Sequence, residues 1–265
     1  FIILTFTFLT DGLFLSSRNI SNLLDSAGYI AVLAVGVMLV IVIRHIDLSI
    51  GYLAGFLGAI AAILLMRMEL SVYLTIPMIL LLGTVFGLIT GFLVAQIGIP
   101  AFVATLAGML IFRGALLLVT EKTGTIIVQD DAFNAIGNGF IPSIIEVNGL
   151  HLLTLIVGAA GILFYIYGAV SMRRNKINYQ FEVISKPIFV MQLVFVSAII
   201  AYITWILAGY RGFSWTMVIM LAVVAVYHFF TTKTVLGWHI YAVGSNPEAA
   251  HLSGINVKKI TYLVF

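Results

Sequence analysis

The chain has 265 residues and a formal net charge of +3; 62% of the residues are of the types AVILMFWYC, 9% are charged, and the mean hydropathy is +1.19. So little polar surface cannot cover a soluble globule, so the composition excludes that class and indicates an integral membrane protein. The absence of cysteine excludes disulfides and thiolate metal sites. The predicted fold class is all-α, a polytopic integral membrane helical bundle, with residues 1–265 forming a single transmembrane domain.

Apolar runs long enough to cross a bilayer recur along the chain. After an apolar run at 1–9 and a polar connector at 10–26, spans are predicted at 27–43, 50–66, 72–95, 97–119, 150–170, 188–208 and 215–230, with another beginning at 260. The runs 27–43 and 50–66 have only 17 residues each, the short limit for crossing about 30 Å of hydrocarbon. Because both ends lie inside apolar runs, we expect a chain that is cut at both ends.

Basic residues indicate the orientation when the spans alternate sides. One side then carries eight of them: Arg44, Arg173, Arg174, Lys176, Lys186, Lys233, Lys258 and Lys259. The other side carries Arg18, Arg67, Lys122 and Arg211. The richer side is predicted to be cytoplasmic, which makes the loop 120–149 external.

Small residues recur at helical spacing in two of the predicted spans. They are Gly83, Gly87 and Gly91 in one span, and Gly51, Gly55 and Ala59 in the other. Such seams let helix backbones approach closely, so we expect them to mark packing interfaces within the bundle or between subunits.

A polar break, residues 46–49, separates two short apolar runs. Non-helical backbone at membrane depth survives only where protein buries it or a watery cavity hydrates it, so a break of this kind points to a transport pathway. Asp47 offers acceptors and Ser49 both a donor and an acceptor for a neutral polyhydroxylated solute. The alternative is an ordinary cytoplasmic hairpin in which Asp47 caps the next helix.

Arg113 is a charge inside a predicted span. A buried cation costs several kcal/mol unless it is paired or reaches the interface, so Arg113 either lines or gates the pathway or extends its side chain to the interface. The five histidines show no spacing that builds a metal site, and no nucleotide-binding loop of the type GxxxxGK[ST] occurs. An ATP-driven machine would need a second polypeptide for the nucleotide.

A polar island at 241–257 is predicted to contain one short helix that contacts a partner protein. Either Asn246 caps it with Pro247 at the first helical position, or Ser245 caps it with Glu248 as a capping box, and Gly254 supplies a left-handed stop. Two turns of helix do not hold themselves in water, so something must dock against them. The alternative is a surface turn between two spans.

Three stretches give the chain a resemblance to the permease subunits of bacterial monosaccharide ABC importers, the family of ribose, galactose and xylose permeases. They are 34–41 (AVGVMLVI) with 46–51 (IDLSIG), 102–114 (FVATLAGMLIFRG) and 236–257 (LGWHIYAVGSNPEAAHLSGINV). Ribose-type permeases run almost directly from the span at 150–170 into the last stretch. The basic loop and two further spans inserted here resemble the xylose-type branch.

The resemblance implies a multi-pass protein of the bacterial inner membrane with no catalytic residues and no cofactor, and with further C-terminal helices that are absent from this sequence. Its implied partners are an ABC ATPase subunit, a second permease subunit in a homodimer, a soluble sugar-binding protein and a monosaccharide such as xylose, without nucleic acid. The pathway residues predicted from the polar break and the charged span are Asp47, Ser49 and Arg113. The implied ATPase-coupling residues are Gly244, Asn246, Glu248, Ala249, Ala250, Leu252 and Gly254.

Two other functions compete with this interpretation. A secondary transporter of a small polar solute would normally embed a carboxylate or histidine relay in its spans, and Asp47 is the one candidate. An integral membrane enzyme would need a catalytic cluster, which the scattered histidines and loop acids do not provide.

Overall fold

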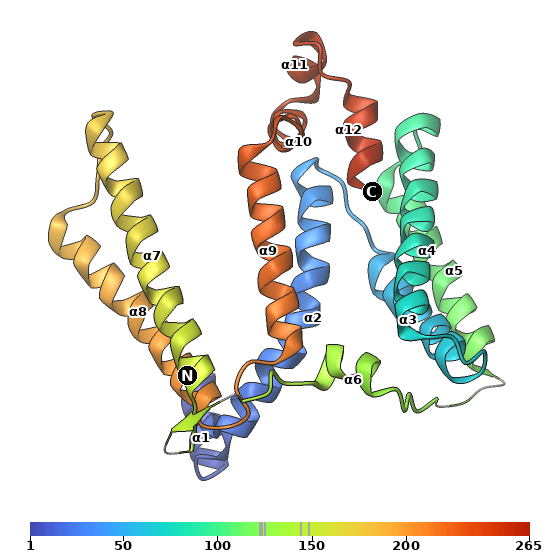
Figure 1. The fold of residues 1–265 in the computed structure, drawn as a ribbon. Coiled ribbons are helices and arrows are strands. Elements are labelled where there is room, and N and C mark those ends of the chain that lie inside the picture. Colours follow the sequence, from blue (N-terminus) through green and yellow to red (C-terminus); the bar gives the residue numbers. More distant parts are fainter. Residues whose placement is uncertain (122–123, 125, 144, 148) are drawn as a thin grey trace. The chain divides into compact units, whose positions relative to one another are not determined.

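The computed structural model describes residues 1–121, 124, 126–143, 145–147 and 149–265 (Figure 1). Lys122, one of the basic residues expected outside, lies beyond the described residues. The all-α prediction is confirmed, and in the described part six helical segments are long and apolar enough to cross a membrane. The elements are α1 (Ile2–Leu9), η1 (Leu13–Leu15), α2 (Ser17–Val42), α3 (Ile50–Met66), α4 (Val72–Phe92), η2 (Leu93–Ile97), α5 (Ala101–Glu121), α6 (Asp131–Asn138), β1 (Glu146–Val147), β2 (Leu150–His151), α7 (Leu152–Asn178), α8 (Lys186–Ala208), α9 (Trp215–Lys233), α10 (Val235–Ser245), α11 (Pro247–Leu252) and α12 (Val257–Val264).

The chain forms two compact units. One unit comprises Phe1–Ala27 and Asn138–Val218, and the other comprises Gly28–Gly137 and Ile219–Phe265.

Besides α7, which continues to Asn178 although its span was predicted to end at residue 170, two predicted boundaries were wrong. The polar connector ends early, because α2 begins at Ser17 and the hydroxyl of Ser16 accepts a hydrogen bond from the backbone N–H of Asn19 at 3.4 Å. The span predicted from residue 97 begins at Ala101, since Gly98 has a left-handed φ of +84° and breaks the helix. Both errors arise where an apolar run and a helix do not coincide.

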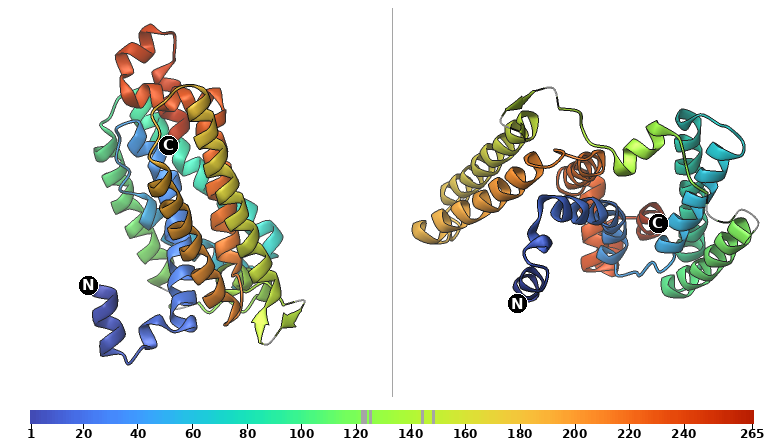
Figure 2. Two further views of the ribbon diagram at one scale, coloured as in Figure 1. Left: turned by 90° about the vertical axis from the view of Figure 1, so that its left-hand side faces the viewer. Right: turned by 90° about the horizontal axis from the view of Figure 1, so that it is seen from below.

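In the first unit, α7 and α8 lie side by side (Figure 2). The contact is close at Gly158, where a Cβ atom would overlap the side chain of Thr204, which is itself 7% exposed. At the start of α9, the buried hydroxyl of Ser214 donates to Asp25 in α2 and accepts from the N–H of Met217 at 3.2 Å. These polar contacts tie α2 to the first turn of α9 within this unit.

In the second unit, α3 packs against α4 and α5, and the right-hand view of Figure 2 shows the three helices together. Phe56, Phe86 and Phe112, one from each helix, have ring centroids 5.0 to 6.2 Å apart. Aromatic pairs at this separation add about 0.5 to 1.5 kcal/mol each beyond their buried area. The short α3 is thereby held against two longer helices.

The glycine seam of α4 is an interface within the chain. A Cβ atom at Gly87 would lie 2.5 Å from the carbonyl oxygen of Phe265, and one at Gly91 would lie 2.9 Å from that of Tyr262. Gly83 instead faces Leu57 of α3. The predicted role of this seam in helix packing is confirmed, with α12 as the main partner.

The loop expected to be external contains structure that the hydropathy pattern did not predict. Helix α6 begins after Asp130, whose carboxylate accepts from the N–H of Phe133 at 2.8 Å. Strands β1 and β2 form an antiparallel hairpin in which Val147 pairs with Leu150. Short polar segments like these carry no long apolar run.

Candidate functional site

The polar break at 46–49 lies beside the first turns of α5. The hydroxyl of Thr105 donates to the carbonyl oxygen of Ile46 at 3.1 Å. At Gly108 an added Cβ atom would lie 3.3 Å from the Cβ atom of Ser49. Since α5 begins at Ala101, these contacts lie roughly 6 to 10 Å along the helix from its start. Figure 1 shows the connection from α2 running down beside this helix group before α3 begins.

Asp47 and Ser49 form one hydrogen-bonded turn. The Asp47 carboxylate accepts from the backbone N–H of Ser49 at 2.8 Å and from its hydroxyl at 2.7 Å. Ser49 is the N-cap residue of α3 and is 3% exposed, whereas Asp47 is partly buried. Asp47 therefore fixes the conformation of the residues just before α3 by binding Ser49. Within the described residues, Asp47 accepts no hydrogen bond from the N–H groups in the first turn of α3. The break thus has a feature of each prediction. Asp47 orders the start of the next helix, as in the capping alternative, and its carboxylate also lines a cavity, as a pathway residue would.

Asp47 also lines a cavity of about 440 Å³ in the second unit. This volume falls within the range of small-molecule sites, about 300 to 1,000 Å³. The remaining lining comes from α2, the start of α3, α9 and the end of the chain: Gly36, Val37, Leu39, Val40, Ile50, Val226, Tyr227, Phe230, Leu263, Val264 and Phe265. Asp47 and Tyr227 supply its polar side chains, so the cavity is mostly apolar with few directing groups. The ring centroid of His45 lies 5.9 Å from that of Phe265, which lines the cavity, and burial lowers the pKa of His45.

Arg113 lies apart from this cavity. Its side chain is exposed, and the guanidinium carbon lies 5.9 Å from the ring centroid of Tyr52 in the first turn of α3. A cation over an aromatic ring at this distance gains about 0.5 to 1 kcal/mol at an exposed site. The structure thus brings Asp47 and Ser49 together but does not place Arg113 on the same cavity.

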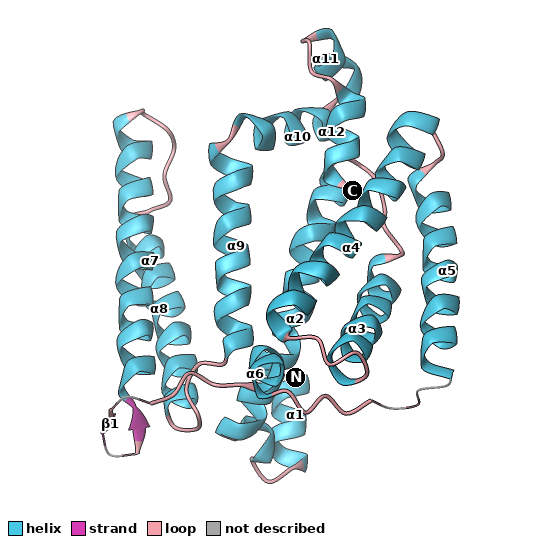
Figure 3. Ribbon diagram, turned by 45° about the vertical axis from the view of Figure 1, so that its right-hand side comes forward, coloured by secondary structure: helices cyan, strands magenta, loops and turns pink. Residues whose placement is uncertain are grey.

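The segment 241–257 folds as the end of α10, the short helix α11 and a turn into α12. The side chain of Asn246 accepts from the N–H groups of Glu248 and Ala249, each at 3.0 Å, and Gly254 has a φ of +85°. The Asn246 cap and the left-handed stop are confirmed. The Ser245 cap is wrong, because that residue ends α10. Figure 3 shows α10 crosswise to α9, followed by α11.

One side of α11 packs on the chain itself and the other side is exposed. Ala250 is 5% exposed and belongs to a cluster with Leu39, Ile43, Ile240, Val243 and Ile260. Its side chain therefore does not lie on the outer face where we expected it. Leu252 is 87% exposed, and Glu248 and Ala249 are exposed as well. These three side chains form the outer face of α11, which has no partner within the described residues.

Arg44 makes a long-range contact that the sequence analysis did not predict. Its Nε donates to the carbonyl oxygen of Gly244 at 2.6 Å, and its Nη2 donates to that of Ser245. A Cβ atom at Gly244 would overlap the carbonyl oxygen of Val42. The end of α2 and the end of α10 therefore touch. A contact between positions 200 residues apart leaves no local pattern in the sequence.

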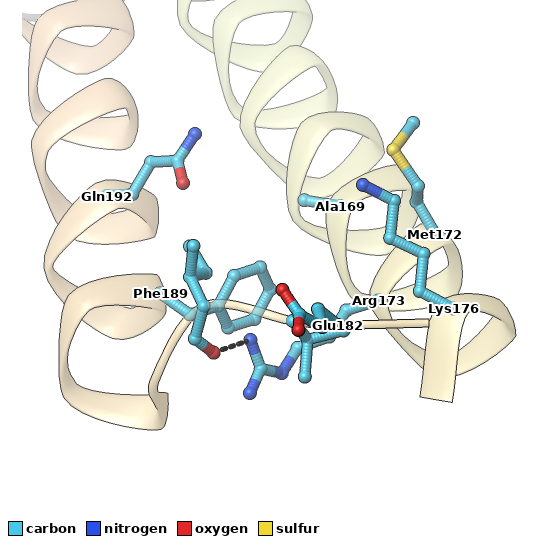
Figure 4. A pocket seen from close by; sticks show the side chains of 9 residues that line it. Ala169, Met172, Arg173, Lys176, Glu182, Phe189 and Gln192 are labelled. Carbon is cyan, nitrogen blue, oxygen red and sulfur yellow. Dashed lines mark hydrogen bonds between the residues drawn. The ribbon is translucent and has the colours of Figure 1, made fainter. Parts of the chain in front are cut away.

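A second cavity, of about 260 Å³, lies between α7 and α8 in the first unit (Figure 4). Arg173 donates to the carbonyl oxygen of Ile184 at 2.7 Å, and its guanidinium carbon lies 4.7 Å from the ring centroid of Phe189. Lys176 and Glu182 also line this cavity. The arginine contacts order the basic loop between the two helices.

Comparison with known proteins finds one matching family and several relatives, all of which are named as transport permeases. The family described as the permease component of branched-chain amino acid transport systems matches residues 19–265. The xylose transport system permease protein XylH of Escherichia coli (strain K12) is 36% identical over 266 residues, covering 100% of this chain and 65% of that protein. The corresponding protein of Haemophilus influenzae (strain Rd) is 34% identical over 98% of this chain and 67% of its own length.

A ribose import permease protein RbsC of Haemophilus influenzae is 31% identical over 95% of this chain and 57% of its own length. The chain thus spans somewhat less than two thirds of the Escherichia coli xylose relative and a smaller share of the ribose one. No solved structure matches the chain.

Proposed function

We propose a function from one premise: the chain belongs to the family of permease components of branched-chain amino acid transport systems. The protein that contains it acts as the transmembrane permease subunit of an ATP-binding cassette importer for a monosaccharide. Relatives named as xylose and ribose permeases support a sugar as the solute, and the higher identity to the xylose relatives favours xylose. The protein resides in the bacterial inner membrane, supported by its six apolar helices of spanning length within the described residues.

The single observation that carries this proposal is the polar break beside α5. Asp47 and Ser49 interrupt the apolar sequence roughly 6 to 10 Å along that helix, and Asp47 faces a cavity. A sugar entering there exchanges hydrogen bonds with water for bonds with the Asp47 carboxylate and with backbone groups of a non-helical segment, while the buried Ser49 hydroxyl holds that carboxylate in place. Weak binding is sufficient, because a delivery protein can supply the specificity.

Energy comes from separate ATPase subunits, so this chain is a transport subunit and not itself an enzyme. The outer face of α11 contacts the ATPase, with exposed Leu252 as its apolar centre. A loaded sugar-binding protein docks on the external face, ATP binding closes the ATPases, and a second permease subunit completes the translocation path. Arg113 lines or gates the path from α5, where its guanidinium lies over the ring of Tyr52.

Two substitutions of Asp47 test the pathway role in the full-length transporter. Asp47→Asn keeps an oxygen that can accept from Ser49 but removes the charge, whereas Asp47→Ala removes both. Sugar uptake should fall in both variants, because a carboxylate accepts hydroxyl hydrogen bonds more strongly than an amide does. Asp11→Asn, at an exposed turn, is the matched control. Co-purification of the ATPase should be unchanged in all three.

The outcomes separate the functions. Uptake by Asp47→Asn equal to that of the wild type, with loss only in Asp47→Ala, would assign the residue to the turn at the start of α3. Uptake driven by an ion gradient, with no ATPase subunit co-purifying, would instead favour a secondary transporter.

A further inference from the structure

We infer that Arg44 is a positioning residue that connects the segment 241–257 to the polar break at 46–49. Movement of α10 under the force of the ATPase is thereby transmitted to the turn that holds Asp47 and Ser49. This inference rests on the proposed function and assigns a coupling role to a residue that contacts neither sugar nor ATP.

The guanidinium of Arg44 satisfies the end of α10. The last carbonyl groups of a helix have no partner within the helix and carry its partial negative charge. Arg44 donates to two of them, those of Gly244 and Ser245, from two different nitrogens. A planar fork with several donors can hold two acceptors in fixed positions, which the single ammonium of lysine does less well. Arg44 therefore follows α10 when α10 moves.

The backbone of Arg44 is fixed to the last turn of α2. Its N–H donates to the carbonyl oxygen of Ile41 at 2.9 Å, and the N–H of His45 donates to that of Val40 at 3.0 Å. Arg44 has a φ of +65°, a left-handed conformation in which helices usually place glycine or asparagine. The left-handed backbone conformation is unfavourable for arginine, and the hydrogen bonds of its side chain offset this cost.

The polar break begins two residues after Arg44. There, the carbonyl oxygen of Ile46 accepts from Thr105, and Ser49 lies against Gly108, so two contacts join the break to α5. On the other side, Gly244 lies directly against the end of α2, leaving no space for α10 to move without pushing on it. The connection thus runs from the outer face of α11 through α10 and Arg44 to the break, all within one compact unit.

Arg44→Gly is the decisive variant, because glycine adopts the positive φ without strain and removes only the side chain. Arg44→Lys keeps the charge but loses the fork. Arg174→Ala, at an exposed arginine near the end of α7, is the matched control for loss of one positive charge. The full-length transporter is reconstituted in vesicles with its ATPase and sugar-binding protein. Uptake of xylose and hydrolysis of ATP are measured in the same sample.

If Arg44 couples the two sites, Arg44→Gly should lower the amount of xylose transported per ATP hydrolysed roughly fivefold or more, the lower end of typical coupling between sites. Arg44→Lys should give an intermediate ratio, and Arg174→Ala should match the wild type. The ATPase should still co-purify with every variant.

A proportional fall of uptake and hydrolysis in Arg44→Gly, with an unchanged ratio, would show that Arg44 only stabilises the fold and would overturn the inference. An unchanged ratio at unchanged rates would overturn it too. Failure of the proposed function is recognised separately, since the wild-type protein itself would then show no ATP-driven uptake.

Discussion

Leu252→Ala tests whether the outer face of α11 binds the ATPase. The side chain is 87% exposed in this chain, so nearly all of its apolar surface remains to be buried by a partner. Alanine lacks three of its carbon atoms, and at about 0.8 kcal/mol for each buried carbon the loss is about 2.4 kcal/mol. The dissociation constant for the ATPase subunit should therefore rise about fiftyfold.

The measurement is a binding titration of the ATPase subunit to full-length permease held in lipid nanodiscs. Leu13→Ala is the matched control. It makes the same substitution at a leucine that is 71% exposed, in η1, which is expected on the external side of the membrane. Glu248→Ala should have a smaller effect, because exposed ion pairs contribute about 1 kcal/mol at most. A dissociation constant within about twofold of the wild type in Leu252→Ala would refute the assignment of this face, since twofold corresponds to less than about 0.5 kcal/mol.

Three further predictions concern orientation, packing and pH. An impermeant thiol reagent applied outside intact cells should label Ala132→Cys but not Asn175→Cys; the reverse pattern would invert the topology. Gly158→Val should lower the melting temperature, because its added carbons overlap Thr204, and unchanged melting would contradict this close contact. Burial lowers the pKa of His45, so the unfolded chain takes up its proton first as pH falls below 6.5. Melting should therefore decline below that pH, less so in His45→Gln.

The long helices could be predicted because each must bury an apolar stretch in lipid, and composition alone records that requirement. The break at 46–49 and the cap at Asn246 could also be predicted, since polar residues at such positions have local hydrogen-bonding roles. The inward orientation of Ala250 could not, because it depends on the cluster formed with α2, α10 and α12. Arg44 looked like one more basic residue, and only the folded chain brings it to the end of α10.

The packing of α12 against α4 limits how copies of this protein can assemble. Glycine seams are common sites of self-association between membrane helices, because they allow two backbones to approach. Here the carbonyl groups of Tyr262 and Phe265 already occupy the positions that open at Gly91 and Gly87. A neighbouring copy cannot use this part of α4 while α12 covers it, so any symmetric dimer would have to form through another surface of the protein.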